Sequence, residues 1–124
     1  MPNSILIKNR IRTYNKKIKV SGDKSLSIRW VLFASLANGT SKAKNLLMSE
    51  DVLAALNAVK KLGIKVIINV KECRIFGKGI NGYKYKKKLT INAHNSGTLG
   101  RLILGLLTNT PYPINLVGDK SLSK

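Results

Sequence analysis

The chain has 124 residues, 44% of them hydrophobic, which is enough apolar material for one modest core. Its 23 Lys and Arg residues outweigh 5 Asp and Glu residues and give a net charge of +18. One cysteine excludes an internal disulfide framework, and one histidine with so few carboxylates argues against a metal centre. No apolar run has the length of a membrane span and the N-terminus lacks a signal-peptide core, so we expect a cytoplasmic protein without a membrane partner.

The positive charge by itself predicts a polyanionic partner. The lysines, however, are spread over the whole chain, and the densest run, Tyr83–Lys88, lies between glycine-containing turns. Aromatic residues make up only 6% of the chain, without the alternation of aromatic and basic residues that single-strand binders use. We therefore interpret most lysines as solvated surface and keep a basic nucleic-acid-binding module as the alternative.

In chain order, an exposed segment precedes the first predicted helix. Ser4–Ile18 alternates weakly between apolar and basic residues, as exposed or edge strands do. Gly22 then permits a tight turn, and Asp23 or Ser25 can cap a helix that runs to Ala37. The apolar stripe predicted to pack this helix on a sheet consists of Leu26, Trp30, Phe33 and Ala37.

The other face of this helix is polar. Ser25 and Arg29 are four residues apart and so lie on one face, with Lys24 beside them at the helix start. Unpaired backbone N–H groups and the positive end of the helix dipole point to the same place, where a phosphate or carboxylate fits. The alternative is an ordinary helix N-terminus with a serine cap and two solvated cations.

A second helix follows a short strand. Asn38–Gly39 closes the first helix, and Ser41–Met48 indicates the strand. Ser49–Asp51 supply a cap and negative charge for the second helix, which Gly63 ends. Its two acidic residues are also candidates for an acid–base pair, although capping explains them better. The buried stripe is predicted to be Val52, Leu56, Val59 and Leu62.

A β-rich region comes next. Ile64–Val70 and Cys73–Phe76 are predicted to form a hairpin, with Cys73 a buried apolar residue rather than a reactive thiol. Gly77–Gly82 has GxGxxG spacing, but a strand at Lys84–Ile91 follows it instead of a helix. The glycines therefore predict turns and not a dinucleotide site.

The third predicted helix opens within His94–Arg101. Gly97 and Arg101 repeat the four-residue spacing of the first helix start, and Gly97 lets a ligand approach the backbone closely. A strand at Ile114–Val117 follows, and Gly118–Lys124 begins another helix. The buried stripe of the third helix is predicted to be Leu99, Leu102, Ile103 and Leu106.

The order of elements repeats. Ser25 corresponds to Gly97 and Asp51 to about Asp119, so the period is roughly 70 residues and the second copy stops near its middle. Strands that alternate with amphipathic helices predict an α/β (α+β) fold.

Three segments carry a resemblance to a known family, and they read GDKSLSIRWVLFASLANGTSKAKNLLMSED, NSGTLGRLILGLL and GDKSL. Together they resemble the N-terminal part of 5-enolpyruvylshikimate-3-phosphate synthase, the carboxyvinyltransferase of the shikimate pathway of aromatic amino acid biosynthesis. The resemblance covers most of Lys19–Lys124. A sister transferase that acts on UDP-N-acetylglucosamine typically has Lys-Asn where Lys24–Ser25 stand here, which favours the shikimate enzyme.

The resemblance implies two domains, each of three βαβαββ units, that close on the substrates. One full unit and part of a second then lie in this chain. Residues 1–19 are expected to be a strand segment of the other domain, and residues 20–124 an incomplete N-terminal substrate-binding domain. The whole enzyme is expected to be a monomer that needs no cofactor or metal.

The resemblance also implies a site for two anionic substrates, shikimate 3-phosphate and phosphoenolpyruvate, whose phosphates and carboxylates need Lys and Arg. It implies that glyphosate, an inhibitor of the whole enzyme, shares the phosphoenolpyruvate site. No catalytic residue is assigned within this chain. The implied ligands of shikimate 3-phosphate are Lys24, Ser25 and Arg29; those of phosphoenolpyruvate are Lys24 and Gly97; Asn95, Thr98 and Arg101 support the pocket.

Three departures from the family qualify this picture. His94 stands where the family usually has glycine, and Leu102 where some members have proline. An arginine that binds phosphoenolpyruvate, and the acid–base residues, belong beyond Lys124. We therefore expect a truncated chain that is inactive alone, whose parent enzyme transfers enolpyruvyl to the 5-hydroxyl of shikimate 3-phosphate. A further alternative is a regulatory or structural half-domain that pairs with a separately encoded remainder.

Overall fold

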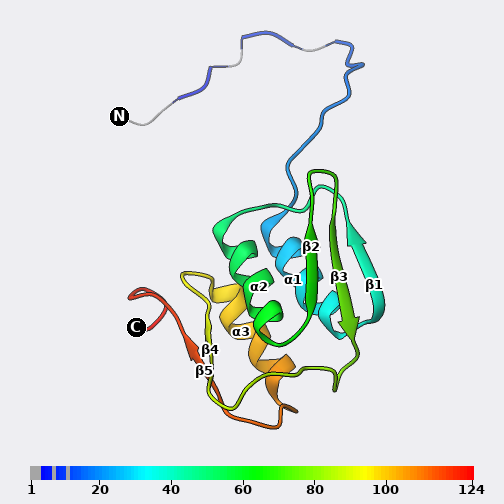
Figure 1. Ribbon diagram of the computed structural model, residues 1–124. Helices are drawn as coiled ribbons and strands as arrows, with labels where there is room; N and C mark the ends of the chain where they lie inside the picture. Colours follow the sequence, from blue (N-terminus) through cyan, green and yellow to red (C-terminus); the bar gives the residue numbers. More distant parts are fainter. Residues whose placement is uncertain (1–3, 7, 11) are drawn as a thin grey trace.

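The computed structural model describes residues 4–6, 8–10 and 12–124. Figure 1 shows helices in contact with two separate groups of strands. Within the described residues the elements are, in chain order, α1 (Lys24–Leu36), β1 (Asn38–Ala43), α2 (Glu50–Lys61), β2 (Lys65–Ile68), β3 (Cys73–Lys78), β4 (Leu89–Asn92), α3 (Gly97–Leu107) and β5 (Ile114–Val117).

The strands form two small sheets. β3 pairs antiparallel with both β1 and β2, so the predicted hairpin is confirmed. β4 and β5 pair parallel, and α3 connects them. α2 contacts both β2 and β4 and so links the two sheets. The predicted α/β class is confirmed, and the turn glycines between β3 and β4 lead into no helix.

The buried face of α1 differs from the predicted stripe. Leu26 and Phe33 are 65% and 66% exposed, whereas Ile28, Val31 and Leu32 are buried against β3 and α2. Apolar residues lie on more than one side of this helix, so two different sets of them satisfy helical spacing. Tertiary packing selected the face that the sequence pattern did not indicate.

The stripe predicted for α2 is confirmed, because Val52, Leu56, Val59 and Leu62 are all at most 1% exposed. Ser49 stands at the N-cap position, but its side chain makes no capping hydrogen bond. Its buried Oγ has no partner within the described part of the chain. The cap expected from this serine is therefore wrong, and Glu50 and Asp51 alone complement the helix start.

Some element boundaries and buried positions also differ from those predicted. α1 ends at Leu36 with Ala37 as its C-cap, so Asn38 opens β1 three residues before the predicted strand. In α3, Leu99 and Ile103 are fully buried, but Leu102 is 38% exposed. Leu102 lies against α1, where it lines a small cavity, instead of entering the core.

A buried polar pair joins α1 to the segment between β3 and β4. The Oγ of Ser35 donates to the carbonyl of Leu32 at 2.6 Å and lies 2.7 Å from the hydroxyl of Tyr83. A serine hydroxyl has one hydrogen, so the Tyr83 hydroxyl is the donor in the second bond. Burial raises the pKa of Tyr83. This tyrosine begins the basic run noted above, but its ring belongs to the core.

The two ends of the chain also depart from expectation. The described residues of Ser4–Ile18 form no strand, and they are exposed in a segment that extends away from the body (Figure 1). Gly118–Lys124 forms a single hydrogen-bonded turn in place of a helix, closed by the Ser123 N–H donating to the Asp119 carbonyl at 3.0 Å. Among the described residues, no helix is both long and apolar enough to cross a membrane.

Candidate anion-binding site

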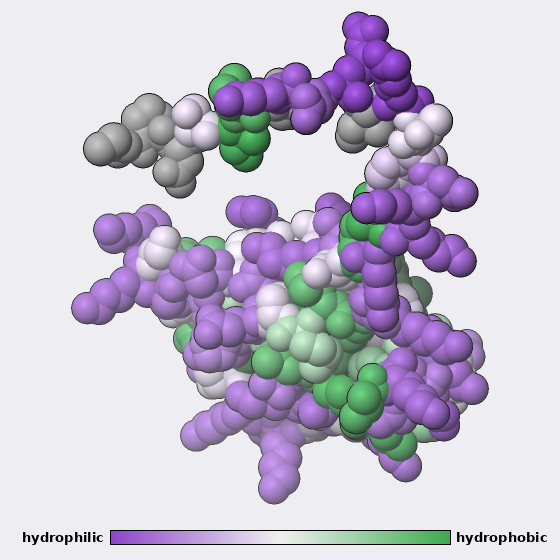
Figure 2. Space-filling view, turned by 90° about the horizontal axis from the view of Figure 1, so that it is seen from above, coloured by the Kyte–Doolittle hydropathy of each residue, from purple (hydrophilic) through white to green (hydrophobic). Residues whose placement is uncertain are grey.

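The three helices run in the same general direction in Figure 1; α1 and α2 begin side by side near one end of the body, and α3 begins lower in this view. Each helix start carries unpaired N–H groups and the positive end of a dipole, and these three ends point in the same general direction. Figure 2 looks onto this end and shows hydrophilic residues around a smaller hydrophobic patch. The fold thus gives a common orientation to helix starts that are separate in the sequence.

At the start of α1 the cap is an aspartate. The Oδ1 of Asp23 accepts from the Leu26 N–H at 2.6 Å, which leaves the partly buried Ser25 free of the capping role. Gly22 is required just before this cap, because a Cβ there would lie 2.2 Å from the carbonyl oxygen of Asn45. A close approach of two backbone segments therefore fixes the start of α1.

The lysine of this helix start has an acidic partner. The Nζ of Lys24 lies 3.0 Å from the Oδ2 of Asp51, which stands in the first turn of α2. The Lys24 side chain remains 54% exposed. The sequence assigned Asp51 to the helix start, with an acid–base pair as the alternative, and did not predict its contact with Lys24.

Arg29 lies one turn further along α1, where it meets α3. It lines a cavity of about 110 Å³ together with Leu32 and Phe33 of α1 and with Leu102 and Leu106 of α3. Within the described part of the chain, Arg29 forms no ion pair, so its charge is available to a ligand.

At the start of α3, Ser96 is the cap, and its buried Oγ accepts from the Leu99 N–H at 3.2 Å. The guanidinium of Arg101 folds back over Gly97, since a Cβ at Gly97 would lie 3.2 Å from its Nη2. Because Gly97 has no side chain, the positive charge of Arg101 can lie close to the start of α3. Arg101, like Arg29, forms no ion pair among the described residues.

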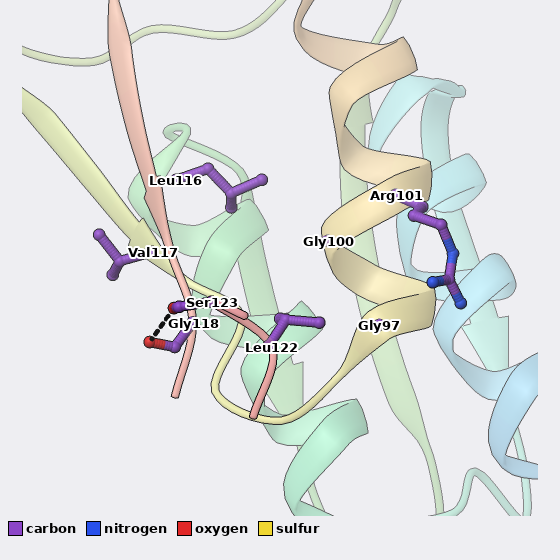
Figure 3. Close-up of a pocket in the computed structure, with 8 residues that line it drawn as sticks. All are labelled: Gly97, Gly100, Arg101, Leu116, Val117, Gly118, Leu122 and Ser123. Atoms are coloured by element: carbon purple, nitrogen blue, oxygen red, sulfur yellow. Dashed lines mark hydrogen bonds between the residues drawn. The ribbon is translucent and has the colours of Figure 1, made fainter. Parts of the chain in front are cut away.

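A cavity of about 440 Å³ lies between α3 and the end of the chain (Figure 3). In that view Arg101 extends along the side of α3 away from Leu122. Thr98 is partly buried and does not line this cavity. The lining residues are Gly97, Gly100, Arg101, Leu116, Val117, Gly118, Leu122 and Ser123.

Asn95, expected to support the pocket, is held by an aspartate that sequence reasoning did not assign to the site. The Nδ2 of Asn95 donates to the Oδ2 of Asp119 at 2.6 Å. The Oδ1 of Asp119 accepts from the N–H groups of Ser121 and Leu122 at 2.9 and 2.8 Å. The bond from the Leu122 N–H, followed by that from Asn95, lowers the pKa of Asp119. The repeat in the sequence could have pointed to Asp119, because it makes Asp119 correspond to Asp51.

The residue before Asn95 has an uncommon backbone. His94 has φ 50°, its N–H donates to the Oδ1 of Asn92 at 2.8 Å, and its carbonyl accepts from the Asp119 N–H at 2.8 Å. Left-handed φ values favour glycine. The two hydrogen bonds hold the histidine in this conformation from both sides.

Some of the predicted site residues therefore lie close together in the structure, and others do not. Gly97 and Arg101 come together at the start of α3, and Arg29 reaches α3 across the small cavity. Lys24 does not line the cavity at α3. A contact of Lys24 and Gly97 with one ligand stays a prediction.

The described residues form a mixed helix-and-strand protein in which Arg29 and Arg101, near the starts of α1 and α3, make no ion pair with a described residue. The profile of EPSP synthase (3-phosphoshikimate 1-carboxyvinyltransferase) matches residues 8–124. The chain belongs to the EPSP synthase family, as the sequence resemblance indicated.

Relatives agree with this assignment. A 3-phosphoshikimate 1-carboxyvinyltransferase of Bacillus cytotoxicus is 39% identical over 93% of this chain, and that of Ruthia magnifica is 44% identical over 86%. A solved structure of EPSP synthase from Acinetobacter baumannii matches 88% of this chain with a TM-score of 0.80 at 36% identity. This chain spans about a quarter of the length of these relatives, at 27%, 24% and 25%.

Proposed function

We propose that the chain supplies part of the substrate-binding half of a 3-phosphoshikimate 1-carboxyvinyltransferase. In this role Lys24, Ser25 and Arg29 bind shikimate 3-phosphate at the start of α1. Gly97 contacts phosphoenolpyruvate with Lys24, while Asn95, Thr98 and Arg101 shape its pocket. The parent reaction transfers the enolpyruvyl group to the 5-hydroxyl of shikimate 3-phosphate and releases phosphate.

One observation carries this proposal: the guanidinium of Arg101 lies over Gly97 at the start of α3. An anion there meets a cation, unpaired backbone N–H groups and the positive end of a helix dipole. Arg29 supplies a second cation at the neighbouring helix, and no acidic side chain within the described residues pairs with either arginine. Two adjacent anion sites suit two anionic substrates.

The chain by itself is not expected to turn over. Enolpyruvyl transfer needs groups that give and take protons. Four of the five carboxylates already have partners: Asp23 caps α1, Asp51 contacts Lys24, Glu72 contacts Arg74, and Asp119 caps the final turn. Glu50 is exposed at the start of α2. Measurable turnover by the purified 124-residue chain would contradict this expectation.

The first test is an NMR titration of the backbone amides with shikimate 3-phosphate and then with phosphoenolpyruvate. We expect shifts at Lys24–Arg29 with the first ligand and at Gly97–Arg101 with the second. Arg29→Ala should abolish the first set, because a charge-assisted bond to phosphate is lost.

Lys60→Ala is the matched control. It removes one positive charge as well, but from the last turn of α2, at the end of that helix opposite to its start. In Lys60→Ala, the amide shifts caused by shikimate 3-phosphate should equal those of the unchanged chain. If Lys60→Ala weakens binding as much as Arg29→Ala, or if affinity follows the salt dependence of polyanion binding without regard to Arg29, the nucleic-acid alternative gains support.

We also propose that glyphosate occupies the phosphoenolpyruvate site of the whole protein. Like phosphoenolpyruvate it carries a phosphorus-centred anion and a carboxylate, which the arginine and helix start at α3 suit. In the titration it should shift the same amides, Gly97–Arg101, and compete with phosphoenolpyruvate.

Residues 1–19 have a separate role in this proposal. We assign them as a strand segment that pairs with a part of the protein outside these 124 residues, and residues 20–124 as an incomplete N-terminal domain. Ile5, Leu6 and Ile18 are 89%, 77% and 72% exposed, so this segment carries apolar side chains that the described body does not cover.

A further inference from the structure

Asp119 connects two segments that meet at the cavity beside α3. Its Oδ2 accepts from the Asn95 side chain at 2.6 Å, and its own N–H donates to the His94 carbonyl at 2.8 Å. Its Oδ1 accepts from the backbone of Ser121 and Leu122, and Leu122 lines the cavity. One side chain thus ties the segment before α3 to the turn that forms the far wall.

The first repeat contains a similar contact. There, Asp51 at the start of α2 meets Lys24 at the start of α1 at 3.0 Å. In both repeats an acidic residue from a later turn reaches a predicted site residue near the start of an earlier helix: Lys24 is a predicted ligand, and Asn95 is predicted to support the pocket. In the repeat Lys24 corresponds to Ser96, one residue after Asn95, so the two contacts lie at neighbouring and not identical places.

We propose that Asp119 is a positioning residue, which holds the Asn95 amide and the segment before α3 in the geometry that receives the phosphoenolpyruvate anion. This inference rests on the proposed function. Asp119 does not touch the ligand in this account. Asn95 is exposed, and without Asp119 its amide is free to rotate.

Electrostatics alone makes the opposite prediction for Asp119. A carboxylate near an anion site repels the ligand, so removing it should tighten binding. If Asp119 positions the site, removing it should weaken binding, because the carboxylate already accepts three N–H donors and its loss frees both segments. The sign of the change in Kd therefore separates the two accounts.

The experiment is a double-mutant cycle on the 124-residue chain, with the Kd for phosphoenolpyruvate measured by amide NMR. Asp119→Ser keeps an oxygen that can cap the final turn but is too short to reach Asn95, and Asn95→Ala removes the other partner. Each change should raise Kd about three- to tenfold, and the double variant should be no weaker than the weaker single variant. Asp119→Glu should restore part of the affinity. Additive effects, an unchanged Kd or a lower Kd in Asp119→Ser would overturn the proposal.

A second readout needs no ligand. The Nδ2 resonance of Asn95 should shift, and its ¹⁵N relaxation should show faster motion, in Asp119→Ser, while the Leu99 amide that Ser96 caps stays unchanged. If no variant binds phosphoenolpyruvate, the unchanged chain included, the proposed function fails and this readout decides the positioning role. An Asn95 side chain that does not respond to Asp119→Ser would refute it.

Discussion

At the scale of single residues, His94 has a backbone conformation that is unfavourable for a residue with a side chain. Its φ of 50° lies in the left-handed region, where a side chain crowds the following carbonyl. Hydrogen bonds to Asn92 and from Asp119 keep it there. The sequence resemblance marked this position as one where the family usually has glycine, and the backbone supplies the physical reason.

We therefore predict that His94→Gly stabilises the chain. Relief of the left-handed conformation is worth about 1–2 kcal/mol, and the extra flexibility of glycine in the unfolded chain offsets about 0.5–1 kcal/mol of it. The free energy of unfolding, from urea denaturation, should rise by about 0.5–1 kcal/mol.

His94→Ala is the control, because it removes the imidazole but keeps the Cβ. It should show no gain in the free energy of unfolding. An equal gain in both variants would mean that the imidazole, and not the backbone, was the source of the strain.

At the scale of elements, the spacing of apolar residues predicted the wrong buried face for α1. Its sequence contains Leu26, Trp30 and Phe33 on one face and Ile28, Val31 and Leu32 on another. Both sets satisfy helical spacing, but only the second is buried throughout; of the first set, Trp30 is half-buried against the core and the other two are exposed. α2 is different, since charged residues at both of its ends, with Asn57 between them, mark the exposed side and leave one face clearly more apolar.

Neighbouring residues on α1 test this correction. Leu32→Ala should lower the free energy of unfolding by about 2–5 kcal/mol, because Leu32 is 2% exposed and its loss leaves a cavity. Phe33→Ala should change it by less than about 1 kcal/mol, because Phe33 is 66% exposed.

Urea denaturation of the two variants under the same conditions shows which one loses more free energy of unfolding. The predicted stripe requires the reverse order, with Phe33→Ala the more damaging change. That order would show that the face described here is not the one that packs in solution.

At the scale of the whole molecule, the N-terminal segment stands apart from the body. The described residues of Ser4–Ile18 are exposed, and the bond from the Asn45 side chain to the Val20 carbonyl, at 3.3 Å, lies beyond that segment. The body has its own core, shared among α1, α2, α3 and both sheets. The segment is therefore not expected to contribute to the stability of the body.

Removal of residues 1–19 tests this separation. The shortened chain 20–124 should have a free energy of unfolding within about 0.5 kcal/mol of that of the full 124 residues. Its amide spectrum should superimpose on that of the longer chain, except near the new terminus. A large loss of stability would place the segment in the folded body and contradict its assignment to a partner domain.

The sequence by itself determined the class of fold, the β2–β3 hairpin, the stripe of α2 and the family; the repeat stays a prediction. These features rest on local signals, namely spacing, turn residues and motifs, which do not depend on distant parts of the chain. Only the tertiary structure decided which face of α1 is buried, that Asp23 and not Ser25 caps it, and that Asp51 and Asp119 reach Lys24 and Asn95. The reason is physical: each of these outcomes depends on groups more than twenty residues apart, or on a choice between two local arrangements of similar energy that packing alone resolves.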